Sequence, residues 1–512
     1  MCFNVEHRRT MVMQVSQNKS GGLSNLWAQI AALVWPFWVA NIMEMFERLA
    51  YYGVRVVIPI YICQADEVSG LHFTQSDKGF IYLWWAIVQS VLPVFTGGAA
   101  DRYGYKNQIR FAIVLKMIGY VMMATQRDFW MFFAGCMTLA AGTAVFKPPV
   151  QATFSRTLND SNSGAGWGLF YMVVNIGGGF GPPIAHFLYG YSWAAVFYGC
   201  AVMVAVNFFW LSTYKEVDSG GKKEGNLLDV AKLTLRNIIR PKLLFFIAIM
   251  SAFWAGFTQL FDVMPNYIVD WVDSSTLASQ LPEFMLKTTK NGAGEKVLDV
   301  ARGFQVDQSW LININALMIV LLVVPLSWLV NNHMRRLTSI FLGMAVSAVG
   351  LMMVPQSFGW VVCVVGIVLF SLGEMLASPK MSEYLAVIAP ADQKALYMGY
   401  SNIPFAFGWG YGAWYGGQIY GQLGEKATLA LRYVSESTGL PQWLVNIGIG
   451  PEKSFEFVQT AIGKNATDTT LLLWNKYQPG QVWYPFAYFI FAAAVGLIIY
   501  NHFAKKWAEA NA

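Results

Sequence analysis

Two carboxylates and two guanidiniums interrupt an apolar run near the start of the chain. Glu44, Glu47, Arg48 and Arg55 lie in a stretch, 27–62, that otherwise reads as one hydrophobic helix. A helix needs only about 20 apolar residues to span a bilayer, so these charges would lie in mid-span. A charged side chain there costs roughly 2.5 kcal/mol or more, and such groups pair with one another or line a polar cavity. The pattern indicates a functional cluster.

The spacing of these residues places them on neighbouring parts of one helical face. Residues three and four apart lie side by side on a helix, and Tyr51 and Tyr52 continue the series between Arg48 and Arg55. A charged stripe that faces a cavity follows from this arrangement. The alternative is an ion-pair network that only locks two helices together.

The composition predicts a polytopic membrane protein. Of the 512 residues, 56% are hydrophobic and only 12% are charged, which leaves too little charge for the surface of a soluble protein of this size. The net charge of +6 is dispersed between apolar runs, so the expected partner is the lipid bilayer and not nucleic acid. The five histidines and five cysteines show no metal-ligand spacing. We therefore expect no metal, no cofactor and no enzymatic activity.

Apolar runs recur along the chain in two sets of six, separated by a polar stretch. The runs lie at about 27–62, 79–100, 109–127, 129–154, 166–189, 192–213, 243–270, 308–330, 337–355, 359–388, 395–421 and 481–504. The expected fold is all-α, with 12 transmembrane helices in two six-helix bundles and a substrate site between them. The expected parts are an N-terminal tail (1–26), a first bundle (27–214), a linker (215–240), a second bundle (241–507) and a C-terminal tail (508–512).

The basic residues predict the orientation of the bundles. They gather in loops that would share one side of the membrane, at 102–110, 215–240, 335–336 and 505–506. The positive-inside rule makes this side, with both termini and the linker, cytoplasmic. Two longer segments, about 271–307 and 422–480, then lie outside. The expected location is the plasma membrane, or the inner membrane in a Gram-negative bacterium.

Two motifs give the chain a family resemblance. The stretch from Glu44 to Gly53 resembles the Glu-x-x-Glu-Arg-Phe-x-Tyr-Tyr-Gly motif of the proton-dependent oligopeptide transporters, a branch of the major facilitator superfamily, and only Leu49 departs from it. The loop after the second run resembles the loop signature of the superfamily, with a generic glycine-rich turn as the alternative. Its matching residues are Gly97, Asp101, Arg102 and Gly104.

Further polar residues within apolar runs match the same family. Lys147 precedes a proline, as does a lysine of the family. The family's lysine pairs with the Glu-Arg motif or with the substrate carboxylate. The alternative is a lysine whose ammonium reaches the membrane interface. Asn175 resembles the family's second signature, with helix packing as the alternative. Glu374, in Gly-Glu-x-x-x-Ser-Pro, matches the tenth helix, and a packing acid is the alternative. The other matches in the second half are Trp254, Gln259, Asn315 and Ser378.

Some positions depart from the family pattern. Ser90 replaces an expected tyrosine and Pro149 an expected asparagine, which bears on the pocket for peptide side chains. Thr258 stands where the family has a carboxylate that pairs with the first helix. Asp262 lies four residues further, on the same helical face, about 6 Å along the axis. We expect it to take over the contact with Arg55, and the alternative is an Asp262 that faces water.

The resemblance implies a proton-coupled symporter that imports di- and tripeptides by alternating access and functions as a monomer. A peptide would place its carboxylate near Arg48, Arg55 and Lys147 and its ammonium near Glu374, with Asn175 and Asn315 bonding its termini. Protonation of Glu44 or Glu47 would release Arg48. The expected residues are Glu44, Glu47, Arg48 and Lys147 for proton coupling; Arg48, Tyr52, Arg55, Lys147, Asn175, Trp254, Asn315, Glu374 and Ser378 for substrate; and Arg55 and Asp262 for gating.

Other functions are alternatives. A transporter of nitrate or an organic anion would share the fold, although such a solute does not need an ammonium partner such as Glu374. A membrane-embedded enzyme would need a metal or nucleophile constellation, and a channel fits poorly with opposite charges buried in both halves.

Overall fold

The long helices form the frame of the protein. The computed structural model describes residues 29–159, 162–217, 236–290, 296–388 and 400–509. In these residues the long helices are α3 (Trp35–Cys63), α4 (Gln75–Tyr103), α5 (Tyr105–Thr125), α6 (Phe129–Ser155), α7 (Ser163–Tyr189), α8 (Trp193–Ser212), α10 (Pro241–Phe257), α14 (Gln308–His333), α15 (Arg336–Met353), α16 (Trp360–Ile388), α18 (Asn402–Leu423) and α23 (Trp483–Glu509). The expectation of an all-α, polytopic membrane protein is confirmed.

Helix starts are encoded locally. Thr74 forms a capping box with Asp77 at the start of α4, and Asp128 accepts hydrogen bonds from the first backbone N–H groups of α6. Asp307 accepts a hydrogen bond from the backbone N–H of Ser309 at the start of α14. These side chains satisfy N–H groups that have no partner inside the helix.

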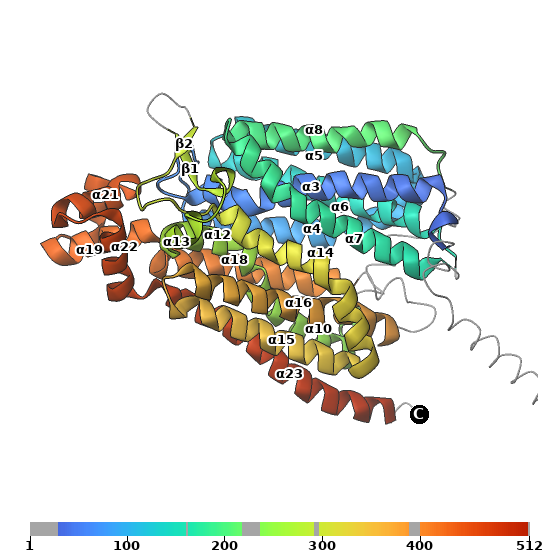
Figure 1. Ribbon diagram of the computed structural model, residues 1–512. Coiled ribbons are helices and arrows are strands. Elements are labelled where there is room, and N and C mark those ends of the chain that lie inside the picture. The colour runs from blue at the N-terminus through green and yellow to red at the C-terminus, as the bar shows by residue number, and fades with distance from the viewer. Residues whose placement is uncertain (1–28, 160–161, 218–235, 291–295, 389–399, 510–512) are drawn as a thin grey trace, which may run out of the picture.

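The helices pack in two groups, each around its own apolar core. One core is built mainly from helices α3–α8 and the other mainly from α10–α23. Figure 1 shows the first group, blue to green, along one side of the molecule and the second group, yellow to red, along the other. We call them the first and second group.

Seven helices of the described part of the chain are long and apolar enough to cross a membrane. Helix α3 is not among them because four charged side chains interrupt its apolar sequence, and α18 is rich in glycine. Both nevertheless lie alongside the apolar helices in Figure 1. Helices that are not apolar enough by this criterion, α3 among them, carry several of the polar residues described above.

The expected seventh span is broken. Its continuation after α10 consists of α11 (Gln259–Asp262) and α12 (Met264–Trp271), with non-helical junctions at Thr258 and Val263. Pro265 accounts for the second break, since proline lacks an N–H and clashes with the preceding turn. Asp262 lies at the end of α11, between the two junctions.

One end of the groups carries additional structure. The loop before α14 holds α13 (Ser275–Ala278), η1 (Glu283–Met285) and an antiparallel hairpin of β1 (Thr288–Lys290) and β2 (Lys296–Leu298). Four helices follow α18: α19 (Lys426–Thr438), α20 (Gln442–Ile449), α21 (Pro451–Ile462) and α22 (Ala466–Tyr477). Short 3-10 turns η2 (Val354–Gln356) and η3 (Pro479–Val482) lie next to this end. We call it the loop end (Figure 1). The sequence analysis assigned no helices to these segments.

Glycines bring α3 and α7 close together. A Cβ at Gly177 would lie 2.5 Å from Cβ of Arg48, and one at Gly181 would lie 2.7 Å from the carbonyl oxygen of Leu49. Only small residues allow two membrane helices to approach this closely. The packing fixes α7 directly against the charged stretch of α3.

We expect Gly181→Ala to lower the stability of the protein by about 1–3 kcal/mol, because the new methyl group must push the α3 backbone away. Thermal unfolding of purified protein in detergent measures the change. Gly168→Ala, on the same helix with nothing near its added Cβ, is the matched control. Equal unfolding temperatures for the two variants would contradict the close packing.

Candidate functional site

The charged residues of α3 form a buried cluster. Arg48 forms an ion pair with Glu47, and its Nε lies 3.4 Å from Oε1 of Glu44. Glu44, Glu47 and Arg48 are 1%, 0% and 7% exposed. Oε2 of Glu44 is buried and has no hydrogen-bond partner among the described residues. This cluster can gain or lose a proton, because one of its carboxylates is incompletely paired.

Lys116 of α5 completes the cluster and was missed by the sequence analysis. Its buried ammonium contacts Glu47 and donates a hydrogen bond to Oγ1 of Thr143, at 2.9 Å. Gly142 makes room for it, since a Cβ there would lie 2.5 Å from Cγ of Lys116. The available signal was a single lysine inside the apolar run 109–127. Two cations therefore contact the same carboxylate of Glu47.

Lys147 lies beside this cluster, half-buried. Glu44, Glu47 and Arg48 are its electrostatic neighbours, but in the described part of the chain it makes no direct ion pair with them. Its ammonium thus adds positive charge without being neutralised at short range. Lys147 is available to an anionic group of a ligand.

The second group supplies an acidic counterpart. Oε2 of Glu374 on α16 accepts a hydrogen bond of 2.8 Å from Nδ2 of Asn315 on α14, which also contacts Oγ of Ser371 at 3.0 Å. Glu374 is half-buried. The structure thus brings together two residues, Asn315 and Glu374, that the sequence analysis proposed as substrate ligands.

Aromatic side chains of the first group come near Glu374. Tyr52 and Tyr171 both lie within electrostatic reach of its carboxylate, while the guanidinium of Arg48 lies 5.9 Å from the ring centre of Tyr52. Tyr52 therefore stands between the basic cluster of one group and the acid of the other. Nδ2 of Asn175 donates to the carbonyl of Tyr171 in its own helix.

Two further residues that we expect to bind substrate are Trp254 and Ser378. Half-buried Trp254 packs edge-on against Phe405. The hydroxyl of Ser378 is buried, with no hydrogen-bond partner among the described residues.

Arg55 contacts the second group directly. It forms a buried ion pair with Asp262, whose other carboxylate oxygen accepts a hydrogen bond of 2.9 Å from Nε1 of Trp409. The guanidinium also lies over the rings of Tyr82 and Trp409, at 4.4 and 4.8 Å from their centres. These contacts hold the guanidinium of Arg55 away from Glu374. Thr258 is buried and donates its hydroxyl to the carbonyl of Trp254.

Other polar contacts join the groups towards the loop end. Nζ of Lys78 donates to the backbone oxygen of Asp262 and to Oδ1 of Asn266, both at 2.8 Å. Nδ1 of His186 lies 3.4 Å from Oδ1 of Asp307, and Asn313 donates to the carbonyl of Gly179. In the described residues, the contacts between the groups thus gather on the loop side of the central cluster.

The predicted loop motif is only partly described. The side chains of Asp101 and Arg102, and the surroundings of Gly97, lie outside the described residues. Gly104 ends α4 with φ +89°, a conformation that favours glycine.

Comparison with known proteins identifies the fold. A family model described as Major Facilitator Superfamily matches residues 40–280. Solved structures with the same fold include one described as "Structural insights into substrate recognition in proton dependent oligopeptide transporters", with a TM-score of 0.63 at 17% identity, covering 92% of this chain and 99% of that one. Another, a bacterial homologue of the human drug peptide transporters PepT1 and PepT2, has a TM-score of 0.61 at 18% identity and covers 93% and 99%.

The chain also has sequence relatives of known name. The multidrug resistance protein MdtH of Proteus mirabilis is 24% identical over 388 residues, 75% of this chain and 87% of its own length. The uncharacterized transporter YclF of Bacillus subtilis is 24% identical over 413 residues, 69% and 82%. The protein has the major facilitator superfamily fold, in the form found in proton-dependent oligopeptide transporters. The resemblance indicated by the motifs is confirmed for the fold, which this chain shares with those peptide transporters.

Proposed function

We propose that the protein is a proton-coupled symporter that imports di- and tripeptides. The observation that carries the proposal is the opposition of Arg48 and Lys147 in the first group to Glu374 in the second. A short zwitterion matches this pair of poles: its carboxylate meets the cations, its ammonium meets Glu374, and Asn315 orients Glu374. The peptide transporters among the structural neighbours support the same substrate class.

Proton coupling rests on the buried carboxylates. With Glu47 ionised, Arg48 is held by Glu44 and Glu47. Protonation weakens this hold and frees Arg48 for the peptide carboxylate, so proton and substrate favour the same state. Lys116 keeps Glu47 ionised until a proton arrives, since a neighbouring cation stabilises the charged carboxylate.

We also propose that the loop end faces outside and that both termini are cytoplasmic, as the basic loops indicate. The Arg55–Asp262 pair and its neighbours would then close the outer path. The described conformation would be one in which substrate exchanges with the cytoplasm. The protein would lie in the plasma membrane, with protons as its coupling ion and no cofactor, and would work as a monomer.

A second candidate is drug transport, favoured by the name of the MdtH relatives. Glu374, which has no cationic partner among the described residues, could bind a cationic drug. Uptake of labelled dialanine into liposomes under an imposed proton gradient distinguishes the two functions. Competition by unlabelled dipeptides supports the peptide symporter, whereas competition by nitrate alone or by ethidium alone supports another solute.

Glu374→Gln is expected to weaken binding of dialanine by about tenfold, the loss of one charge-assisted hydrogen bond. N-acetyl-dialanine, which has no ammonium, should bind to the variant and the unchanged protein with similar affinity. Competition binding measures both ligands. Glu383→Gln, on the same helix but in an exposed ion pair with Arg336, is the control. Equal losses for the two ligands would remove Glu374 from the ammonium site.

A further inference from the structure

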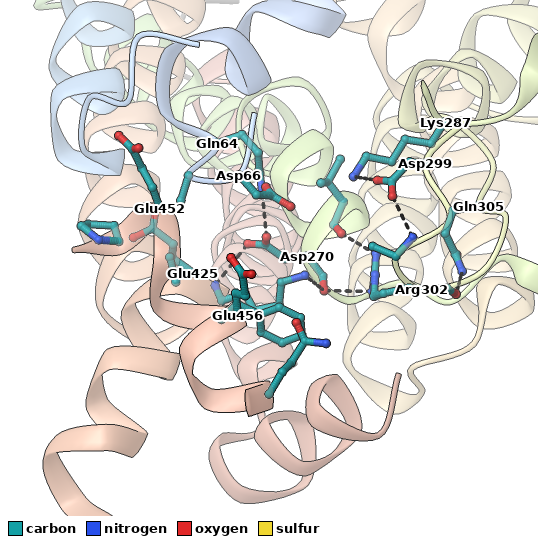
Figure 2. A pocket seen from close by; sticks show the side chains of 18 residues that line it. Gln64, Asp66, Asp270, Lys287, Asp299, Arg302, Gln305, Glu425, Glu452 and Glu456 are labelled. Carbon is teal, nitrogen blue, oxygen red and sulfur yellow. Dashed lines mark hydrogen bonds and ion pairs between the residues drawn. The ribbon is translucent and has the colours of Figure 1, made fainter. Parts of the chain in front are cut away.

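A second cavity lies at the loop end, beyond the Arg55–Asp262 pair. It measures about 360 Å³, within the range of roughly 300–1,000 Å³ typical of small-molecule sites. Its walls come from the loop after α3, the end of α12, the loop before α14, and helices α19 and α21 (Figure 2). It is separate from the cluster around Arg48 and Glu374.

Two cations in the wall make no direct ion pair, although the carboxylates of Asp66 and Asp270 lie near both. Lys426, only 6% exposed, donates from Nζ to the backbone oxygen of Asp270 at 3.2 Å. Arg302 donates to the backbone oxygens of Asp270 and Val269 at 3.2 and 2.6 Å. Among the described residues, neither side chain forms an ion pair. A buried cation held only by carbonyl groups retains a favourable interaction for an anion.

The nearest carboxylate is occupied by neutral donors. Asp270 accepts hydrogen bonds from the amide of Gln64 at 2.9 Å, the hydroxyl of Tyr420 at 2.6 Å and the backbone N–H of Lys426 at 3.2 Å. Burial and the nearby Arg302 lower the pKa of Lys426 to about 8, so its ammonium stays largely protonated at pH 7. The carboxylate of Asp66, also in the wall, partly compensates this charge without forming an ion pair with Lys426.

Helix α21 adds exposed carboxylates to the cavity. Glu452 and Glu456 project from one face of α21 and are exposed. Figure 2 shows them across the cavity from Lys287 and Asp299, which form an ion pair with each other. Phe455 lies between Glu452 and Glu456 in sequence, and its ring centre is 4.7 Å from Nζ of Lys426. The cavity therefore offers cations, exposed carboxylates and an apolar surface to a ligand.

We propose that this cavity is a second binding site for a short zwitterionic peptide, with the carboxylate at Lys426 and Arg302 and the ammonium at Glu452 and Glu456. The substrate class rests on the proposed function, and access from outside rests on the proposed orientation. The site would hold a peptide at the outer mouth while the path beneath it is closed.

Hydrogen bonds connect the cavity with the contacts beneath it. Gln64 donates to Asp270 in the cavity wall and accepts from Nδ2 of Asn266 at 3.0 Å. Asn266 in turn accepts from Lys78, which also donates to the backbone of Asp262. A peptide that displaces Asp270 or Lys426 would act on the residues that join the two groups.

Hydrogen–deuterium exchange of the full-length protein with and without dialanine tests the proposal. Dialanine should slow exchange in residues 299–307 and 451–459, in both the unchanged protein and Glu374→Gln, which impairs the central site. Lys426→Met should raise the half-saturating concentration about tenfold, as expected for the loss of one hydrogen bond to a charged group. Glu452→Gln combined with Glu456→Gln should have a similar effect.

Lys453→Met is the matched control, because Lys453 is exposed on α21 but does not line the cavity. N-acetylalanine and alanine amide, each with one of the two charges, should protect these segments about tenfold more weakly than dialanine. Equal protection by N-acetylalanine would overturn the zwitterion assignment. Protection that disappears in Glu374→Gln but survives in Lys426→Met would place all binding at the central site. Loss of dialanine uptake with retained protection would instead contradict only the proposed transport.

Discussion

Glu47→Gln is expected to reduce the accumulation of peptide driven by a proton gradient to the level of empty liposomes, while exchange of internal for external peptide continues. The carboxylate of Glu47 contacts both Arg48 and Lys116. A neutral amide in its place cannot take up and release a proton, whereas exchange requires no net proton cycle. Labelled dialanine in liposomes, with and without an imposed gradient, measures both activities.

The control for this prediction is Glu436→Gln. Glu436 lies on α19 in partly exposed ion pairs with Arg432 and Lys476, and such pairs contribute little. Its variant should accumulate peptide normally. Peptide accumulation by Glu47→Gln against a gradient would show that the proton binds elsewhere.

Asp262→Asn is expected to slow transport by about a hundredfold and to open the loop end. The variant leaves Arg55 buried without its carboxylate, and breaking one side of a buried ion pair costs about 3–5 kcal/mol. The substitution destabilises the conformation in which Arg55 and residue 262 are in contact. The population of molecules therefore shifts to other conformations. Spin labels at Thr125 and Glu283, both exposed, should report a longer distance.

Charge exchange gives a sharper version of the same test. Asp262→Arg should impair transport, and adding Arg55→Asp in the same chain should partly restore it. Asp468→Asn, at an exposed position in α22, is the neutral control. Full activity of Asp262→Asn would exclude a gating role for the pair.

The fold followed from the sequence because its signals are local. The twelve apolar runs are properties of short segments. The Arg55–Asp262 contact could also be predicted, because helical spacing places Asp262 on the same face as Thr258, where the family has an acid. The structure brings these two residues together, although Pro265 breaks the helix just beyond.

Lys116 could not be assigned from the sequence for a different reason. Spacing shows which residues share a face of one helix, but not which neighbouring helix that face meets. Lys147 and Lys116 are both single lysines in apolar runs, and only packing at Gly142 brings Lys116 onto Glu47. The cavity at the loop end could not be predicted for a similar reason, because its walls come from five segments of the chain.

The central cluster also has a consequence for the membrane voltage. In their charged forms Glu44, Glu47, Arg48 and Lys116 sum to zero, so movement of these four residues through the electric field does no net work. One added proton gives the four residues a net charge of +1. Moving one unit charge across the membrane potential changes the free energy by about 2.3 kcal/mol per 100 mV. Under the proposed proton coupling, the voltage would act on this cluster only in its protonated form, and an inside-negative membrane would favour inward movement of that form.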